Sequence, residues 1–209
     1  MEVVILVYDG LTPLDAIGPF DILGKLPKAR VRVVGLDSGL VHSRGGALGL
    51  RASASLEEIA SADVLVVPGG AGADNLAHDP ALARGLRRLS ASARAVLGVS
   101  TGALLLGGAG LLKGREATTH WRALDLLAGF GATVVPRRIV TSGPFITTNG
   151  AAAGMDAALA LAQTLAGPEV AEAIQLLVGY DPEPPLEAGD LFKAPEARAH
   201  LARTGLERP

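Results

Sequence analysis

Short runs of apolar residues alternate along this chain with longer segments that carry apolar residues at helical spacing. Uninterrupted apolar runs are typical of strands that are buried on both faces of a sheet. Their alternation with helices predicts an α/β fold in which helices cover both faces of a mostly parallel sheet. The predicted strands are residues 2–8, 30–36, 63–67, 95–98, 133–135, 138–141 and 145–148, and the predicted helices are 14–25, 56–60, 80–92, 103–109, 121–128, 151–166 and 168–177.

Two segments depart from this alternation. Residues 41–53 contain two consecutive glycines among small residues, which predicts a hairpin-like excursion. Gly18 and Pro19 lie inside the helix expected at 14–25. Because proline cannot donate the hydrogen bond of a helix interior, that helix should start, break or kink there.

The chain is predicted to form one domain over residues 1–209. A chain of 209 residues can bury one substantial core, and the pattern shows neither an internal repeat nor a linker. Clustered prolines at residues 181–185 end the regular structure. We expect the tail, about residues 190–209, to wrap around the surface.

Composition and charge narrow the range of partners. Apolar residues make up 49% of the chain, and 19 basic residues against 21 acidic ones give a net charge of −2. A nucleic acid partner is not expected, because phosphate binding needs a basic face. No apolar run reaches the roughly 18–20 residues that span a bilayer. The first residues read as a core strand rather than a signal peptide, so the expected compartment is the cytoplasm.

The absence of cysteine excludes disulfides, thiolate metal ligands and thiol chemistry. Four histidines are widely separated along the chain, and none forms a His-x-x-x-His pair. We therefore expect neither a metal site nor a cofactor.

The sequence Gly-Val-Ser-Thr-Gly at residues 98–102 is the strongest chemical signal. It follows an apolar run and precedes an apolar helix, which predicts a strand that ends in a tight turn with Ser100 at its apex. Flanking glycines allow the strained backbone of such a nucleophile elbow. A side chain held there is exposed at the positive end of a helix, which suits a covalent catalyst or an anion site.

Other candidate residues follow neighbouring strands, and strand carboxyl ends meet at one edge of a parallel sheet. The N–H groups of Gly70 and Thr101 could form an oxyanion hole beside the Ser100 hydroxyl. Asp15 could carry protons, and His120 could act as an activating base.

Each candidate also has a structural interpretation. Ser100 could be a small turn residue, and Gly70 could belong to a plain turn. Asp15 could cap the helix that follows it. His120 could simply pack beside Trp121. The joint placement of these residues at strand ends favours a site over these alternatives.

The chain also resembles the ThiJ/PfpI family, and within it the isonitrile hydratase branch. The resemblance extends in order over roughly residues 2–189. The segments that carry it are 15–23 (Asp-Ala-Ile-Gly-Pro-Phe-Asp-Ile-Leu), 66–70 (Val-Val-Pro-Gly-Gly), 98–102, 110–121 (Gly-Leu-Leu-Lys-Gly-Arg-Glu-Ala-Thr-Thr-His-Trp), 150–156 (Gly-Ala-Ala-Ala-Gly-Met-Asp) and 180–185 (Tyr-Asp-Pro-Glu-Pro-Pro).

The resemblance implies a flavodoxin-like three-layer α/β/α sandwich, commonly a homodimer, that acts on a small molecule. In isonitrile hydratases an elbow cysteine attacks the isonitrile carbon, an acid manages protons, and water completes an N-substituted formamide. Matching by position makes Asp15 the acid and places Ser100 at the nucleophile position. Gly70 and Thr101 then match the amide donors, and His120 matches a histidine near the nucleophile.

The chain departs from the family pattern at Ser100, where a cysteine is expected. A serine hydroxyl needs a base in hydrogen-bond contact, whereas a thiol is easily tuned to a thiolate. Asp15 acting as an acid is a poor base. Either a natural serine variant has weak, altered or lost activity, or the cysteine was replaced deliberately. Asn149 is a smaller departure, since relatives often have glycine or serine.

Two other function classes remain open. In an α/β-hydrolase, Ser100 would be followed by an acid and a histidine, such as Asp181 and His200. In a binding module without catalysis, the elbow would hold a small anionic or carbonyl ligand for sensing. The sequence favours an isonitrile-hydratase-like protein whose hydration activity is impaired or altered by Ser100.

Overall fold

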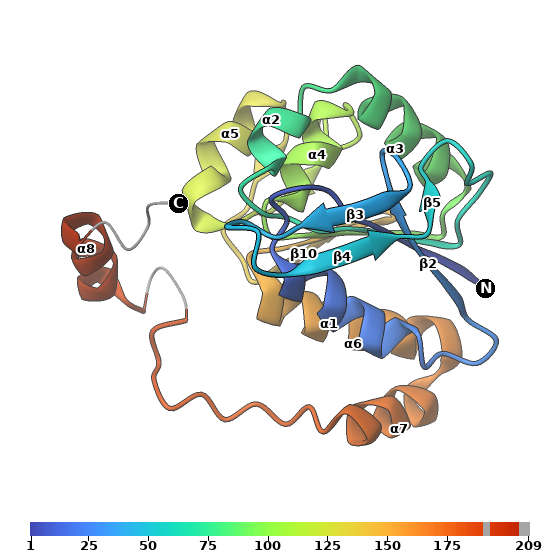
Figure 1. The fold of residues 1–209 in the computed structure, drawn as a ribbon. Coiled ribbons are helices and arrows are strands. Elements are labelled where there is room, and N and C mark those ends of the chain that lie inside the picture. Colours follow the sequence, from blue (N-terminus) through green and yellow to red (C-terminus); the bar gives the residue numbers. More distant parts are fainter. Residues whose placement is uncertain (190–192, 205–209) are drawn as a thin grey trace.

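A seven-stranded sheet forms the centre of the protein in a computed structural model that describes residues 1–189 and 193–204 (Figure 1). Its strand order is β10-β11-β7-β6-β1-β2-β5, and every neighbouring pair is parallel except β10 and β11. The strands are β1 (Glu2–Leu6), β2 (Arg30–Gly35), β5 (Ala54–Ser55), β6 (Val64–Val67), β7 (Ala95–Val99), β10 (Ile139–Ser142) and β11 (Phe145–Thr148).

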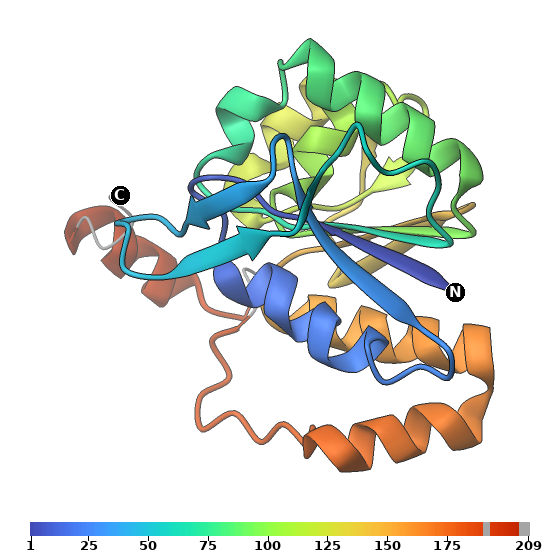
Figure 2. The same cartoon turned by 45° about the vertical axis from the view of Figure 1, so that its right-hand side comes forward.

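Helices cover both faces of this sheet, as Figures 1 and 2 show. One layer consists of α1 (Pro13–Leu23), α6 (Ala151–Ala166) and α7 (Pro168–Val178), and the other of α2 (Ala73–Leu76), α3 (Pro80–Ser92), α4 (Gly102–Gly108) and α5 (Leu124–Gly129). Every residue of β6 and β7 is buried between the layers, which explains their uninterrupted apolar sequences. The predicted flavodoxin-like three-layer architecture is confirmed.

Two small sheets lie outside the central one. The antiparallel pair of β3 (Gly39–His42) and β4 (Gly49–Ala52) confirms the predicted hairpin. The second pair is parallel and consists of β8 (Glu116–Ala117) and β9 (Thr133–Val134). The strand predicted at 133–135 therefore lies outside the central sheet.

The helix predicted at 56–60 is wrong, because a turn follows β5 instead. The backbone groups of this segment bond to other elements. The Leu56 N–H donates to the Gly35 carbonyl of β2 at 2.7 Å. The Arg88 guanidinium of α3 donates to the carbonyls of Leu56 and Ile59. These long-range bonds replace the local bonds that a helix would need.

The expectation that a helix starts or breaks at Gly18 and Pro19 is wrong, because α1 begins at Pro13 and continues through both residues. A kink there stays a prediction. The gap at Gly18 is filled by α6, since a Cβ atom there would lie 2.7 Å from Met155 Cγ. Packing against α6 thus holds the helix across the position where proline removes one hydrogen bond.

The helix predicted at 121–128 consists of two parts, a 3₁₀ turn η1 (Trp121–Ala123) followed by α5. Beyond α7 the chain runs back toward the end of the molecule where α1 begins, and leads to α8 (Pro195–Thr204), as Figure 2 shows. The expectation that regular structure ends at residues 181–185 is therefore wrong. Residues 190–192 and 205–209 of the predicted tail lie outside the described residues.

The elbow helix α4 packs so closely on the strand β6 that its first residue must be glycine. A Cβ atom at Gly102 would overlap the Val67 carbonyl oxygen and lie 2.9 Å from the Pro68 carbonyl carbon. This contact places the start of α4 directly beside the loop after β6. The nucleophile elbow and the glycine loop are therefore held together by the fold itself.

We expect Gly102→Ala to lower the free energy of unfolding by about 1–3 kcal/mol, because the added methyl group meets backbone atoms that cannot move aside. Gly129→Ala is the matched control. It also adds a methyl group in a helix, but nothing lies within 4 Å of its position. Urea denaturation of both variants checks this prediction, and equal stabilities would contradict it.

Candidate functional site

A cavity of about 400 Å³ opens at the carboxyl ends of the central parallel strands. Asp15 reaches it from α1, which follows β1, and Ser100 reaches it from the elbow after β7. Binding sites in open α/β sheets lie at this edge. The polar lining includes Thr12, Asp15, Ser100, Thr118, His120 and Asn149.

Ser100 occupies the strained elbow position that the sequence predicted. Its φ angle is 55°, in the left-handed region that residues other than glycine rarely adopt. Its N–H donates to the Thr148 carbonyl at 3.1 Å, and its carbonyl accepts a 2.9 Å bond from the Thr119 hydroxyl. These bonds fix the backbone while the side chain faces the cavity. Among the described residues, nothing is hydrogen bonded to the Ser100 hydroxyl.

Asp15 is a buried acid, with only 1% of its surface exposed. Its Oδ2 accepts a 3.0 Å hydrogen bond from the Gly69 N–H, whereas its buried Oδ1 has no partner. Burial raises the pKa of Asp15 to about 7, although the Gly69 bond acts in the opposite direction. The alternative of a helix cap is wrong, because Thr12 is the N-cap residue of α1 and no side chain caps that end. Asp15 can therefore hold a proton near neutral pH.

Gly70 and Thr101 meet at the side of the elbow. The Gly70 N–H donates to Thr101 Oγ1 at 2.8 Å, and the same hydroxyl lies 3.2 Å from the Gly70 carbonyl. Both residues line a second cavity that Ser100 and His120 share. Their role as an oxyanion hole stays a prediction, and a ligand oxygen would have to replace the Thr101 hydroxyl at the Gly70 N–H.

His120 lies at the boundary of the two cavities and caps the 3₁₀ turn η1. Its Nδ1 accepts a 3.4 Å bond from the Arg122 N–H, and its ring stacks at a tilt on Trp121 with centroids 5.5 Å apart. The predicted packing beside Trp121 is therefore present, and the ring also lines the cavity that contains Ser100. Its role as a base stays a prediction.

Two threonines of the segment before His120 also belong to the site, and the sequence analysis did not single them out. The hydroxyl of Thr119 holds the elbow carbonyl, as described above. Thr118 lines the cavity, and its fully buried hydroxyl has no partner. The sequence feature that could have identified these two threonines is their place within the segment 110–121, which carries part of the family resemblance.

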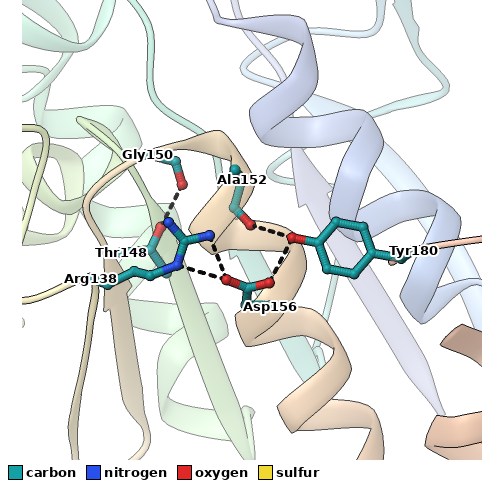
Figure 3. A network of polar contacts seen from close by, with 6 residues as sticks. All are labelled: Arg138, Thr148, Gly150, Ala152, Asp156 and Tyr180. Carbon is teal, nitrogen blue, oxygen red and sulfur yellow. Dashed lines mark hydrogen bonds and ion pairs between the residues drawn. The ribbon is translucent and has the colours of Figure 1, made fainter. Parts of the chain in front are cut away.

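Arg138 lines the cavity within a polar network that Figure 3 shows. Its guanidinium donates to Asp156 Oδ2 at 2.7 Å and 2.6 Å, and the Tyr180 hydroxyl donates to Asp156 Oδ1 at 2.6 Å. Burial, followed by the contact with Asp156, raises the pKa of Tyr180 to about 12. The network joins the residue before β10 and the helix α6 to the segment after α7, which leads on to Gly189 at the cavity.

The acid and the histidine of the hydrolase alternative do not line the cavities that contain Ser100. Asp181 and His200 are exposed, and neither lines the cavities described above. The structure therefore gives no support for a Ser100, Asp181 and His200 triad.

Comparison with known proteins places these features in one family. The sequence model of the DJ-1/PfpI family matches residues 1–164. The isonitrile hydratase of Pseudomonas putida is 41% identical over 203 residues, which cover 97% of this chain and 89% of that protein. The HTH-type transcriptional regulator CdhR of Pseudomonas aeruginosa is 34% identical over 145 residues, which cover 68% of this chain and 42% of the regulator.

Solved structures show the same fold. A ThiJ/PfpI family protein from Pseudomonas syringae has a TM-score of 0.91 at 36% identity, covering 98% of this chain and 85% of that one. Drosophila melanogaster DJ-1beta has a TM-score of 0.77 at 21% identity, covering 87% and 98%. This second likeness shows the fold alone.

The part of the chain that the structure describes contains neither a candidate membrane span nor a candidate metal site. No helix there is both long and apolar enough to span a bilayer. No group of three or more His, Asp or Glu side chains in those residues is arranged to hold a metal ion. The absence of a cofactor stays a prediction.

The raised pKa of Asp15 predicts a pH-dependent stability. The folded state holds the proton up to about pH 7, whereas an ordinary aspartate releases it near its usual value of 3.8. The stability that this proton confers is complete below pH 3.8 and is lost as the pH rises through about 7. Asp15→Asn removes the buried charge, so it should stabilise the protein more at pH 8 than at pH 5, by an amount on the order of a few kcal/mol.

Thermal and urea unfolding of the two proteins at both pH values measure this difference. Asp21→Asn, which removes an exposed carboxylate from the same helix, controls for the loss of one charge. A stability difference between Asp15→Asn and the parent chain that is the same at both pH values would contradict the prediction.

Proposed function

The chain belongs to the DJ-1/PfpI family, and on that premise we propose that it takes small isonitriles into the cavity beside Ser100 and hydrates them to N-substituted formamides. The observation that carries this proposal is the buried acid Asp15, which lines the same cavity as Ser100. The isonitrile hydratase of Pseudomonas putida, which matches almost the whole chain, supports the choice of substrate.

The reaction adds one water to the isonitrile, so that R–N≡C and H₂O give R–NH–CHO. The terminal carbon of an isonitrile carries a lone pair and accepts a proton, which leaves that carbon open to attack by oxygen. A protonated Asp15, available near neutral pH because of its raised pKa of about 7, can supply this proton. The Ser100 oxygen then bonds to that carbon and passes its proton to the Asp15 carboxylate, which gives the imidate R–N=CH–O–Ser100. Water adds across the C=N bond of this imidate, and the adduct expels the Ser100 hydroxyl, which takes back a proton, to release R–NH–CHO.

The serine at position 100 makes the proposed hydration slow. A nucleophilic serine needs a base in contact with its hydroxyl, and no such group is bonded to it among the described residues. A cysteine at the same place would have a much more acidic side chain and would be a far stronger nucleophile. We therefore propose that turnover is slow unless His120 or Asp15 activates Ser100.

A second candidate function is a small-molecule sensor without turnover. The transcriptional regulator CdhR, similar over 145 residues, is the observation in favour of it. The sensor would use the same cavity, and the unpaired hydroxyl of Ser100 would contact the ligand without attacking it. The expected cytoplasmic location stays a prediction under either function.

We also propose that the protein forms a homodimer through α1 and the β3–β4 hairpin. Ile17 and Phe20 of α1 are 41% and 44% exposed, and both line an apolar groove together with Leu50 of β4. Leu40 on the same hairpin is 61% exposed. Exposed apolar side chains around an apolar groove are typical of an interface.

Phe20→Glu should shift the protein from dimer to monomer, because a carboxylate would have to be buried in the apolar groove. Analytical ultracentrifugation measures this directly. Leu177→Glu on α7, where the leucine is 72% exposed, is the matched control and should leave the mass unchanged. A parent chain that sediments as a monomer would contradict the dimer.

Hydration is tested by measuring formamide production from a simple alkyl isonitrile with the parent chain, Ser100→Cys and Ser100→Ala. We expect Ser100→Cys to be at least about tenfold faster than the parent, because the thiolate is the better nucleophile. Calorimetric titration of Ser100→Ala with the isonitrile measures binding separately from turnover. The hydratase assignment fails if all three proteins are inert, and isonitrile binding without turnover in all three would favour the sensor.

A further inference from the structure

Two short segments that are separate in sequence form part of the cavity wall. Residues 136–138, which come just before β10, line it consecutively, and so do residues 151–153 in the first turn of α6. The Asn149 N–H donates to the Arg138 carbonyl at 3.0 Å, but this bond fixes only the backbone between the two segments. The side chain of Arg138 is held separately, by the polar network of Figure 3.

This network bonds both carboxylate oxygens of Asp156, a residue of α6. Two N–H groups of the Arg138 guanidinium share Oδ2, and the Tyr180 hydroxyl donates to Oδ1. The same hydroxyl lies 3.4 Å from the carbonyl of Ala152 in the cavity wall. An exposed ion pair alone contributes little, but a carboxylate with both oxygens bonded is restricted to one orientation. The network therefore holds Arg138 in one place against α6.

Asp156 and Tyr180 act on the cavity only through the residues that they contact. Neither lines either cavity of the site, whereas Arg138 and Ala152 line the cavity that contains Ser100. This part of the wall offers a substrate the methyl groups of residues 151–153, which are all alanine, and the apolar stem of an arginine. Such a surface suits the hydrocarbon substituent of an isonitrile, and a wall that is held firmly excludes a substituent that is too broad.

We propose that Asp156 and Tyr180 are positioning residues that fix Arg138 in the cavity wall and thereby favour isonitriles with short, unbranched substituents over branched ones. The inference rests on the proposed function and adds to it the class of substituent that the cavity selects. Neither residue belongs to the reacting groups, so a change at either one alters the wall and leaves Asp15 and position 100 as they are.

The exchange of the Arg138 Nε–H with solvent, measured by nitrogen-15 NMR, tests the network without a substrate. The signal is assigned by its loss in Arg138→Lys. Because this N–H donates to Asp156 at 2.7 Å, we expect slow exchange in the parent chain, and exchange at least about fivefold faster in Asp156→Asn and Tyr180→Phe.

Glu2→Gln is the matched control, since it weakens another partly exposed ion pair, with Arg32, at the amino end of β1. A variant whose Arg138 Nε–H exchanges no faster than that of Glu2→Gln overturns the role of the residue it replaces.

Selectivity is tested in the Ser100→Cys background by comparing kcat/KM for tert-butyl isonitrile with kcat/KM for ethyl isonitrile. We expect this ratio to rise about 3- to 10-fold in Asp156→Asn and Tyr180→Phe, mainly through KM, which is the effect of losing one hydrogen bond to a charged group. A general loss of stability would lower both rates together and leave the ratio unchanged. A ratio that moves no more than it does in Glu2→Gln overturns the inference.

Calorimetric titration of Ser100→Ala with the same two isonitriles, with and without Asp156→Asn, separates the possible failures. If neither isonitrile binds and no background produces formamide, the proposed function is overturned, and the selectivity with it. Binding or turnover whose selectivity does not respond to Asp156→Asn would overturn only this inference and leave the proposed function in place.

Discussion

The site depends on one contact, the hydrogen bond from the Gly69 N–H to the buried carboxyl of Asp15. It joins α1 to the loop after β6, and the elbow closes against the same point. A Cβ atom at Gly69 would lie 2.5 Å from the Thr101 nitrogen and 2.9 Å from Asp15 Oδ2, so only glycine allows the three segments to meet. The contact satisfies one carboxyl oxygen, and the other is buried without a partner among the described residues. Burial then keeps this acid protonated at a pH where an exposed aspartate is charged.

The elbow is held in a costly conformation that does not depend on the identity of its side chain. A residue other than glycine with φ near 55° costs on the order of 1–3 kcal/mol, which the surrounding structure must offset. Bonds to Thr119 and Thr148 hold the backbone of Ser100 there. The geometry that would aim a cysteine is therefore present with a serine. What changes is the acidity of the nucleophile, not its position, and this is why the proposed function retains the substrate but expects slow turnover.

Local sequence signals predicted the parts of the fold that local interactions determine. Pro80 and its capping residue Asp79 define the start of α3, and the apolar run of β6 is explained by burial on both faces. The turn at 56–60 was missed because its backbone bonds to β2 and to Arg88, which are distant in sequence. The continuity of α1 depends on α6, which fills the space at Gly18.

In the site, too, local sequence signals predicted some features, whereas others depend on side-chain contacts between distant segments. Asp15 and Ser100 were predicted from their places after strands and His120 from the segment 117–121, and all three line one cavity. The bond between the Gly70 N–H and the Thr101 hydroxyl could not be predicted, because it depends on the rotamer of one side chain. The unpartnered hydroxyl of Thr118 was likewise invisible, since sequence does not show which buried polar atoms lack partners.

The most direct test is the pKa of the Asp15 carboxyl itself, measured by carbon-13 NMR titration and assigned by the signal that disappears in Asp15→Asn. A midpoint near pH 7 is expected, because burial with a single hydrogen bond favours the protonated acid. A midpoint near 4 would show that the carboxyl is charged and solvated at neutral pH, and Asp15 would then not be the proton donor of this site.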